Sequence, residues 1–169
     1  AVGANRAVLA QALGARPVFL QQVHGRGVVA LDAHTPQGTQ ADACLTRERG
    51  VACTIMVADC LPLLFTDARG SFVAAAHAGW RGLAAGVLEQ TVAAMEVPGA
   101  RLCVWLGVAI SQRAYEVGPE VRAAFVDLDR GAAAAFAPGA PGHWQCDLQA
   151  LARLRLARLG VSRVFGGEL

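Results

Sequence analysis

The run His77-Ala78-Gly79-Trp80-Arg81-Gly82 joins an apolar stretch, Ser71–Ala76, to a segment with helical character, Leu83–Met95. This order predicts a strand, a sharp corner and a helix. Glycines let the backbone bend and approach a ligand closely, and the first turn of a new helix offers free N–H groups to an anion. A His, a Trp and an Arg between two glycines are poor core residues. The corner is therefore the first candidate functional site.

The rest of the chain reads as many short strands with a few helices between them. Strands are expected over residues 17–23, 27–31, 41–46, 51–58, 62–66, 71–76, 101–108 and 162–165, and helices over 5–13, 83–95, 119–128 and 148–159. Asp147 is expected to cap the last helix, and 132–142 to form a weakly structured linker. The near-continuous apolar strands indicate a sheet covered on both faces. We expect one α/β or α+β domain over residues 1–169.

Composition excludes several classes of protein. All fifteen basic residues are arginines, so Schiff-base chemistry and Walker-type phosphate binding, which need a lysine, are excluded. The net charge of +2 is spread without basic clusters, and we expect no nucleic-acid partner. No apolar run reaches the ~18 residues of a membrane helix, and residues 1–6 do not resemble a signal peptide. We therefore expect a cytoplasmic protein with no membrane partner; the sequence leaves its oligomeric state open.

Three residues at the ends of apolar runs could form a metal site. His24, Cys60 and His77 each lie where a strand is expected to end, and strand ends meet at one edge of a sheet. Two imidazoles and a thiolate, with a fourth position open to water, suit catalytic zinc. The same atoms also permit a metal-free reading, in which Cys60 is a nucleophile and His77 its base. Asp59, next to Cys60, would point to the opposite face of a strand and support the site from behind.

Four further residues are candidates for substrate binding. Arg81, at the expected helix start, could bind a phosphate or carboxylate and take part in catalysis, and Trp80 could stack on a base. Gln22 lies two residues before His24 and could face the same side, and Asp42 follows a loop and could also face the site.

These motifs together resemble the YfiH family, also called the multicopper polyphenol oxidoreductase (laccase-domain) family. The resemblance rests on Gln22-Val23-His24-Gly25, Ala41-Asp42-Ala43, Ala58-Asp59-Cys60-Leu61-Pro62 and His77–Gly82, with support from Tyr115-Glu116-Val117-Gly118 and Asp147-Leu148. Their order and spacing match, and the resemblance covers essentially the whole chain.

The resemblance implies an α/β (α+β) fold with mixed β-sheets flanked by helices, like that of cysteine hydrolases of the cytotoxic-necrotizing-factor type. It also implies a metal site formed by His24, Cys60 and His77, with zinc ranked ahead of copper. The implied activity is that of an enzyme of purine nucleosides: phosphorolysis of adenosine, inosine, guanosine and methylthioadenosine, and deamination of adenosine. A nucleoside and phosphate would be its small-molecule partners. Family members usually begin earlier and end later, so the domain over 1–169 is expected to lack both family ends.

Three other functions stay open from the sequence. The first is a metal-independent Cys/His hydrolase or amidase that acts on a peptidoglycan precursor. The second is a non-catalytic domain that binds a nucleoside or a phosphorylated ligand through Trp80 and Arg81. The third, copper-dependent polyphenol oxidation, ranks lowest, because the four histidines of the chain cannot fill a multi-copper cluster.

Overall fold

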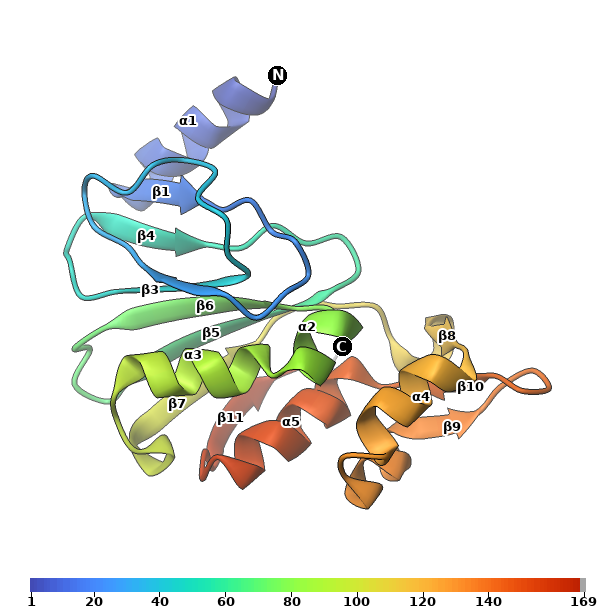
Figure 1. The fold of residues 1–169 in the computed structure, drawn as a ribbon. Helices are drawn as coiled ribbons and strands as arrows, with labels where there is room; N and C mark the ends of the chain where they lie inside the picture. The colour runs from blue at the N-terminus through green and yellow to red at the C-terminus, as the bar shows by residue number, and fades with distance from the viewer. Residues whose placement is uncertain (168–169) are drawn as a thin grey trace.

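A six-stranded mixed sheet is the centre of the fold (Figure 1), in a computed structural model that describes residues 1–167. Its strands, in spatial order, are β11 (Arg163–Gly166), β7 (Leu102–Leu106), β5 (Leu61–Asp67), β6 (Val73–Ala78), β3 (Ala43–Thr46) and β2 (Val28–Ala30). The neighbours from β7 through β3 are antiparallel, whereas β11 and β2 run parallel to the strands they pair with. The predicted α+β class with mixed sheets and flanking helices is therefore confirmed.

Helices cover one face of this sheet. The α-helices on this face are α2 (Trp80–Ala85), α3 (Val87–Met95) and α5 (Leu148–Arg158), whereas α1 (Val2–Leu13) and α4 (Pro119–Val126) pack elsewhere. Apolar residues of α2, α3 and α5 form one core with the inward side chains of β5, because Leu61, Leu63 and Phe65 recur at the two-residue period of a strand. None of the helices in residues 1–167 is both long and apolar enough to cross a membrane.

The other face of the sheet is covered over only part of its width. The parallel pair β1 (Arg16–Phe19) and β4 (Val51–Thr54) forms a second small sheet, whose Val18 and Val51 pack with Cys44 and Ala75 of the central sheet. On the opposite side of the same face, large apolar side chains of β5, β7 and β11 remain exposed to solvent. The prediction of strands covered on both faces is therefore wrong for this half of the sheet.

The C-terminal third of the chain adds a small antiparallel sheet of β8 (Glu116–Val117), β10 (Trp144–Cys146) and β9 (Phe136–Pro138). The predicted weak linker over 132–142 is wrong in its first half. That half contains the end of a 3-10 helix, Arg130–Ala135, and β9, because Ala132, Ala135 and Phe136 are buried in the main core. The predicted cap of α5 is confirmed, since the Ala150 N–H donates to the Asp147 carboxylate at 2.8 Å.

The strand-to-helix corner at residues 77–82 forms as expected, with one difference. The strand β6 reaches Ala78 and the helix begins at Trp80, but the predicted helix 83–95 is divided in two at Gly86. Gly86 has φ 92°, a left-handed conformation that ends α2 and changes the direction of the chain before α3. The break separates the short helix next to His77 from the helix that packs along the sheet.

We predict that Leu63→Ala lowers the free energy of unfolding by about 2–5 kcal/mol, because it leaves a cavity in a fully buried site. The matched control is Leu64→Ala on the exposed face of the same strand, which should cost less than about 1 kcal/mol. Urea unfolding followed by circular dichroism measures both values. Equal losses in the two variants would contradict the assignment of the two faces.

Candidate metal centre

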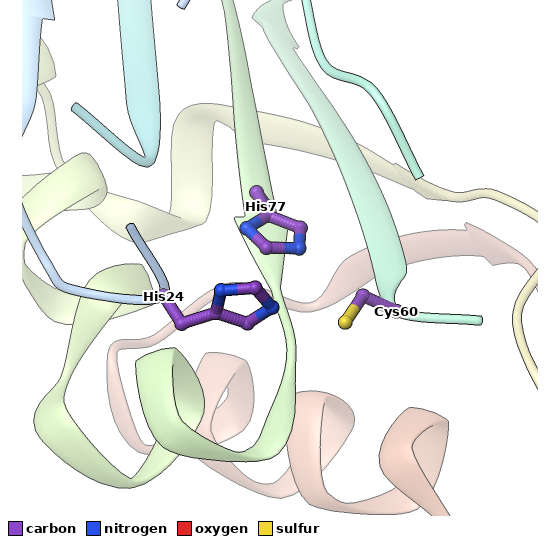
Figure 2. Close-up of side chains that lie close together, drawn as sticks. All are labelled: His24, Cys60 and His77. Carbon is purple, nitrogen blue, oxygen red and sulfur yellow. The ribbon is translucent and has the colours of Figure 1, made fainter. Parts of the chain in front are cut away.

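The structure brings His24, Cys60 and His77 together at one edge of the central sheet (Figure 2). Their ligand atoms all lie within 4.8 Å of one another. The two imidazole rings meet edge to face, with centroids 4.8 Å apart and an angle of 74° between their planes. Figure 2 shows both rings and the Cys60 thiol turned toward a common space. Cys60 and His77 follow His24 by 36 and 53 positions in the chain, yet the three side chains form one compact donor set.

Strand register explains why Cys60 and His77 meet. Strands β5 and β6 are antiparallel, with Leu61 opposite Ala78 and Pro62 opposite His77, so the start of β5 lies beside the end of β6. Cys60 directly precedes β5. The prediction that Cys60 follows the end of a strand is wrong, because β4 already ends at Thr54 and the next six residues form a connection. Because β5 is antiparallel to β6, its first residue lies beside the last residue of β6, and Cys60 reaches the predicted edge from the start of a strand.

Asp42 is the residue that organises this edge. It is fully buried, and its carboxylate accepts hydrogen bonds from the backbone N–H groups of Val23 (3.2 Å), His24 (2.9 Å) and Gly25 (2.7 Å). The same carboxylate lies 2.9 Å from Nδ1 of His77, which must donate because a carboxylate only accepts. Nε2 of His77 is thereby left free to act as a ligand.

These bonds also determine the charge of Asp42. Burial alone would raise its pKa, but the hydrogen bonds from His77 and from the backbone of residues 23–25 outweigh burial and hold the pKa below its usual value. The predicted substrate contact of Asp42 does not fit this environment. A fully buried carboxylate with four donors around it positions the two histidines and has no surface to offer a substrate.

The same carboxylate accounts for an unusual backbone conformation at His24. This residue has φ 59°, in the left-handed region that few residues other than glycine adopt. Three successive N–H groups that converge on one anion form a nest, and the nest requires such a turn of the chain. Asp42 therefore holds His24 in a conformation that would cost energy without the buried anion.

Gln22 ties the His24 loop to the chain that leads into Cys60. Its side-chain amide donates to the Met56 carbonyl at 2.8 Å and accepts from the Met56 N–H at 2.8 Å. The side-chain amide of Gln22 thus pairs with both backbone groups of Met56, as a residue of a neighbouring strand would. The structure thus gives Gln22 a bracing role, and the predicted role in substrate binding does not fit these bonds.

Two glycines of the opening motif leave room for the donor set. A Cβ at Gly79 would lie 2.8 Å from Sγ of Cys60 and 3.3 Å from Cδ2 of His24. A Cβ at Gly82 would lie 3.0 Å from the Gly25 carbonyl oxygen, so α2 packs directly on the His24 loop. Any larger residue at position 79 would fill the space between the ligands. Gly79 is required here for this space, since its φ of −70° suits any residue.

Trp80 and Arg81 directly follow Gly79 in the chain but differ in exposure. Trp80 is half-buried against the core, and the exposed Arg81 guanidinium lies 4.5 Å from the centroid of its ring. Tyr115 feels the charges of Cys60 and Arg81: burial and then the charges of Cys146 and Cys60 raise its pKa to about 12, while Arg81 acts in the opposite direction. The sequence did not predict Tyr115 as a site residue, because no local pattern around it indicates that it lies near Cys60 and Arg81.

The donor set suits a metal such as zinc. Two imidazole nitrogens and one thiolate leave a fourth position of a tetrahedral site open, which is typical of catalytic zinc. Without a bound cation, burial and then the charges of Asp59 and Asp42 raise the pKa of the Cys60 thiol. A bound metal deprotonates a coordinating thiol outright, so the acidic surroundings favour a cation at this position.

Comparison with known proteins identifies relatives of this chain. The family model described as "Multi-copper polyphenol oxidoreductase laccase" matches residues 1–169. The protein is 55% identical over 168 residues to "Purine nucleoside phosphorylase PA4543" of Pseudomonas aeruginosa, a match that covers 99% of this chain and 69% of the relative. It is 47% identical over 156 residues to "Purine nucleoside phosphorylase YfiH" of Escherichia coli, covering 92% of this chain and 64% of that relative.

Solved structures give the same relationship. The Neisseria meningitidis protein NMB0706 superposes with a TM-score of 0.94 at 47% identity, over 96% of this chain and 67% of that one. YlmD from Geobacillus stearothermophilus superposes with a TM-score of 0.84 at 28% identity, over 97% of this chain and 68% of that one. The chain thus spans about two thirds of the length of the relatives it matches.

We predict that Asp42→Asn weakens zinc binding by about 10- to 100-fold, because an amide cannot hold His77 and the 23–25 backbone as the carboxylate does. The matched control is Asp59→Asn, which changes an exposed carboxylate next to Cys60 and should shift affinity by less than about tenfold. Competition with a chromogenic chelator measures both affinities. Equal affinity of Asp42→Asn and the unmutated protein would contradict the positioning role.

Proposed function

This chain belongs to the multi-copper polyphenol oxidoreductase laccase family, also called the YfiH family, and we propose that it is a metal-dependent purine nucleoside phosphorylase. The observation that carries the proposal is the compact set of His24, Cys60 and His77, built on Asp42, in a chain 55% identical to a relative that bears this name. Adenosine, inosine, guanosine and methylthioadenosine are the proposed substrates, and deamination of adenosine is proposed as a second reaction at the same site.

Phosphorolysis sets two requirements for the residues around the donor set. Phosphate attacks C1′ of the ribose, the bond from C1′ to the base nitrogen breaks, and the base leaves with a proton. The site must therefore hold a phosphate dianion beside the sugar and hold the base in place. The exposed Arg81 guanidinium suits the phosphate, and the half-buried Trp80 ring, over which this guanidinium lies, is the proposed contact for the base.

The proposed metal is zinc, held by Nε2 of His77, a ring nitrogen of His24 and Sγ of Cys60. When bound, zinc would supply Lewis-acid polarisation or an acidified water next to the substrate. Asp42 keeps the His77 ring in one tautomer and orientation, and Gly79 keeps the space between the ligands clear. These protein groups act on the ligands and leave Arg81 and Trp80 to act on the substrate.

The metal-free hydrolase is the weaker alternative on the same atoms. A thiol nucleophile needs a depressed pKa, which a cationic neighbour or a helix N-terminus provides. In the metal-free state, burial and two carboxylates instead raise the pKa of Cys60. The Asp42–His77 bond leaves Nε2 of His77 free to act as a base, so the argument against this alternative rests on the raised pKa of the thiol.

The described residues offer too few clustered metal ligands to support polyphenol oxidation at several copper ions. Within residues 1–167, one group of three His/Cys/Asp/Glu ligands comes together. His34 and His143 are both exposed and lie outside this group. The proposal therefore rests on one metal per chain, with copper ranked below zinc.

We predict that the zinc-loaded protein converts inosine and phosphate to hypoxanthine and ribose 1-phosphate, and that Cys60→Ala abolishes this turnover. The matched control is Cys103→Ala, which removes a half-buried thiol of β7 outside the donor set and should keep the activity. Mass spectrometry of the products, with adenosine as a second substrate, also detects deamination as inosine formation. Absence of turnover by protein containing one zinc per chain would overturn the proposed activity, and undiminished turnover by chelated protein would overturn its metal dependence.

We predict that Arg81→Ala raises KM for phosphate by about tenfold or more, because a charge-assisted hydrogen bond to the anion is lost. KM for the nucleoside should change much less. Arg69→Ala, in the exposed turn after β5, is the control for loss of one positive charge. Steady-state kinetics at varied phosphate separates the two effects. An unchanged KM for phosphate would remove Arg81 from the anion site.

A further inference from the structure

Tyr115 lies near the candidate metal centre, and the proposed function gives it no role. It is the only tyrosine of the chain. It directly follows the 3-10 helix Gln112–Ala114, in the connection between β7 and β8. Its side chain is half-buried and packs against the main core, which Trp80 also contacts. A half-buried ring with a polar O–H has one end in the core and one end available to a ligand.

Backbone hydrogen bonds hold the connection that carries Tyr115 beside Cys60. Directly before Cys60, the Asp59 carbonyl accepts from the Ile110 N–H at 2.9 Å. At the other end of the connection, the Tyr115 carbonyl accepts from the Cys146 N–H of β10 at 2.9 Å. The connection is therefore fixed both to the chain next to Cys60 and to the small antiparallel sheet. Because both anchors are backbone bonds, the place of the phenol is set before a ligand binds.

Electrostatic effects on the phenol show that it lies close to both Cys60 and Arg81. Burial raises its pKa most, the charges of Cys146 and Cys60 raise it further, and the positive charge of Arg81 lowers it. Because the effect of a charge falls off with distance, these groups are near neighbours of the phenol. The resulting pKa is about 12, so the phenol keeps its proton throughout the neutral range. It is a neutral hydrogen-bond donor there.

We propose that the Tyr115 phenol donates a hydrogen bond to the phosphate that Arg81 binds, so that the two side chains form one anion subsite beside Cys60. The inference rests on the proposed phosphorolysis and adds a second group that binds its anionic substrate. A phosphate dianion has more acceptor sites than one guanidinium fork can fill. Asp59 and Asp42 place negative charge beside Cys60, and this charge would repel the anion. A neutral donor adds binding without a further negative charge.

The position of Arg81 favours phosphate over the purine base as the acceptor. Its guanidinium lies 4.5 Å from the centroid of the Trp80 ring, and its charge also acts on the Tyr115 phenol. The guanidinium is thus a neighbour of both aromatic side chains. The base is assigned to the Trp80 ring, which leaves the anion on the guanidinium as the acceptor for the phenol.

The kinetic test is Tyr115→Phe in the zinc-loaded chain, with inosine and phosphate as substrates. This variant keeps the ring and its packing and loses the O–H. We expect KM for phosphate to rise about tenfold or more, because a hydrogen bond to a charged acceptor is lost, and KM for inosine to change less than about twofold. The matched control is Ser162→Ala, which removes an exposed hydroxyl at the opposite end of the central strands and should leave both constants unchanged.

A second measurement observes the phenol directly and needs no turnover. Because the chain has one tyrosine, tyrosine labelled with carbon-13 at Cζ gives a single NMR signal from Tyr115. We expect inorganic phosphate, without nucleoside, to shift this signal saturably. Arg81→Ala should raise the half-saturating phosphate concentration by about tenfold or more, and sodium chloride at matched ionic strength should cause no shift. The labelled unmutated chain keeps the test decisive if Tyr115→Phe does not fold.

The two measurements separate this inference from the proposed function. Turnover with an unchanged phosphate KM in Tyr115→Phe would overturn the inference and leave the phosphorylase standing. A rise in the inosine KM alone would place the phenol at the nucleoside and overturn the inference too. If the unmutated chain shows no turnover, phosphorolysis fails, and the carbon-13 signal decides the anion subsite. A saturable shift that depends on Arg81 then supports the subsite, and no shift overturns it.

Discussion

The buried carboxylate of Asp42 is the interaction on which the rest of the site depends. It satisfies three consecutive backbone N–H groups of residues 23–25 and the Nδ1 atom of His77 at the same time. Each unsatisfied buried donor would cost about 1–3 kcal/mol, so the loop and the strand end are strongly coupled through one side chain. Asp42 thereby sets the backbone of His24, the tautomer of His77 and the distance between the two rings.

The central sheet provides the frame within which this coupling works. Asp42 directly precedes β3, and its own backbone carbonyl accepts from the His77 N–H at 2.7 Å. The antiparallel register of β5 on β6 brings Cys60 beside His77, while Gln22 and Met56 hold the two connecting loops together. Strands are rigid relative to loops, and Cys60 and His77 lie at strand termini, while His24 lies in a loop that Asp42 holds, contrary to its predicted place at the end of a strand.

The two faces of the central sheet differ in what covers them. The helical face carries the large core that stabilises the fold, with Leu61, Leu63 and Phe65 of β5 packed under α2, α3 and α5. The opposite face is partly covered by β1 and β4, and the remainder is apolar and open. The candidate metal centre lies at one edge of the sheet, and none of its three residues lines the open apolar part of this face.

The sequence alone predicted the class of the fold, most of its helices and strands, and three candidate donor residues that the structure brings together. Hydrophobic periodicity reports which face of a local segment is buried, and glycines at a strand-to-helix corner report a close approach of the backbone; both signals are local. Only the tertiary structure decided which contacts Asp42 and Gln22 make, where β4 ends, and that half of one sheet face is open. Those properties depend on hydrogen bonds and packing between segments distant in the chain. His77 and Asp42, 35 residues apart, illustrate the reason: their contact leaves no pattern in either neighbourhood, and only the folded sheet brings them together.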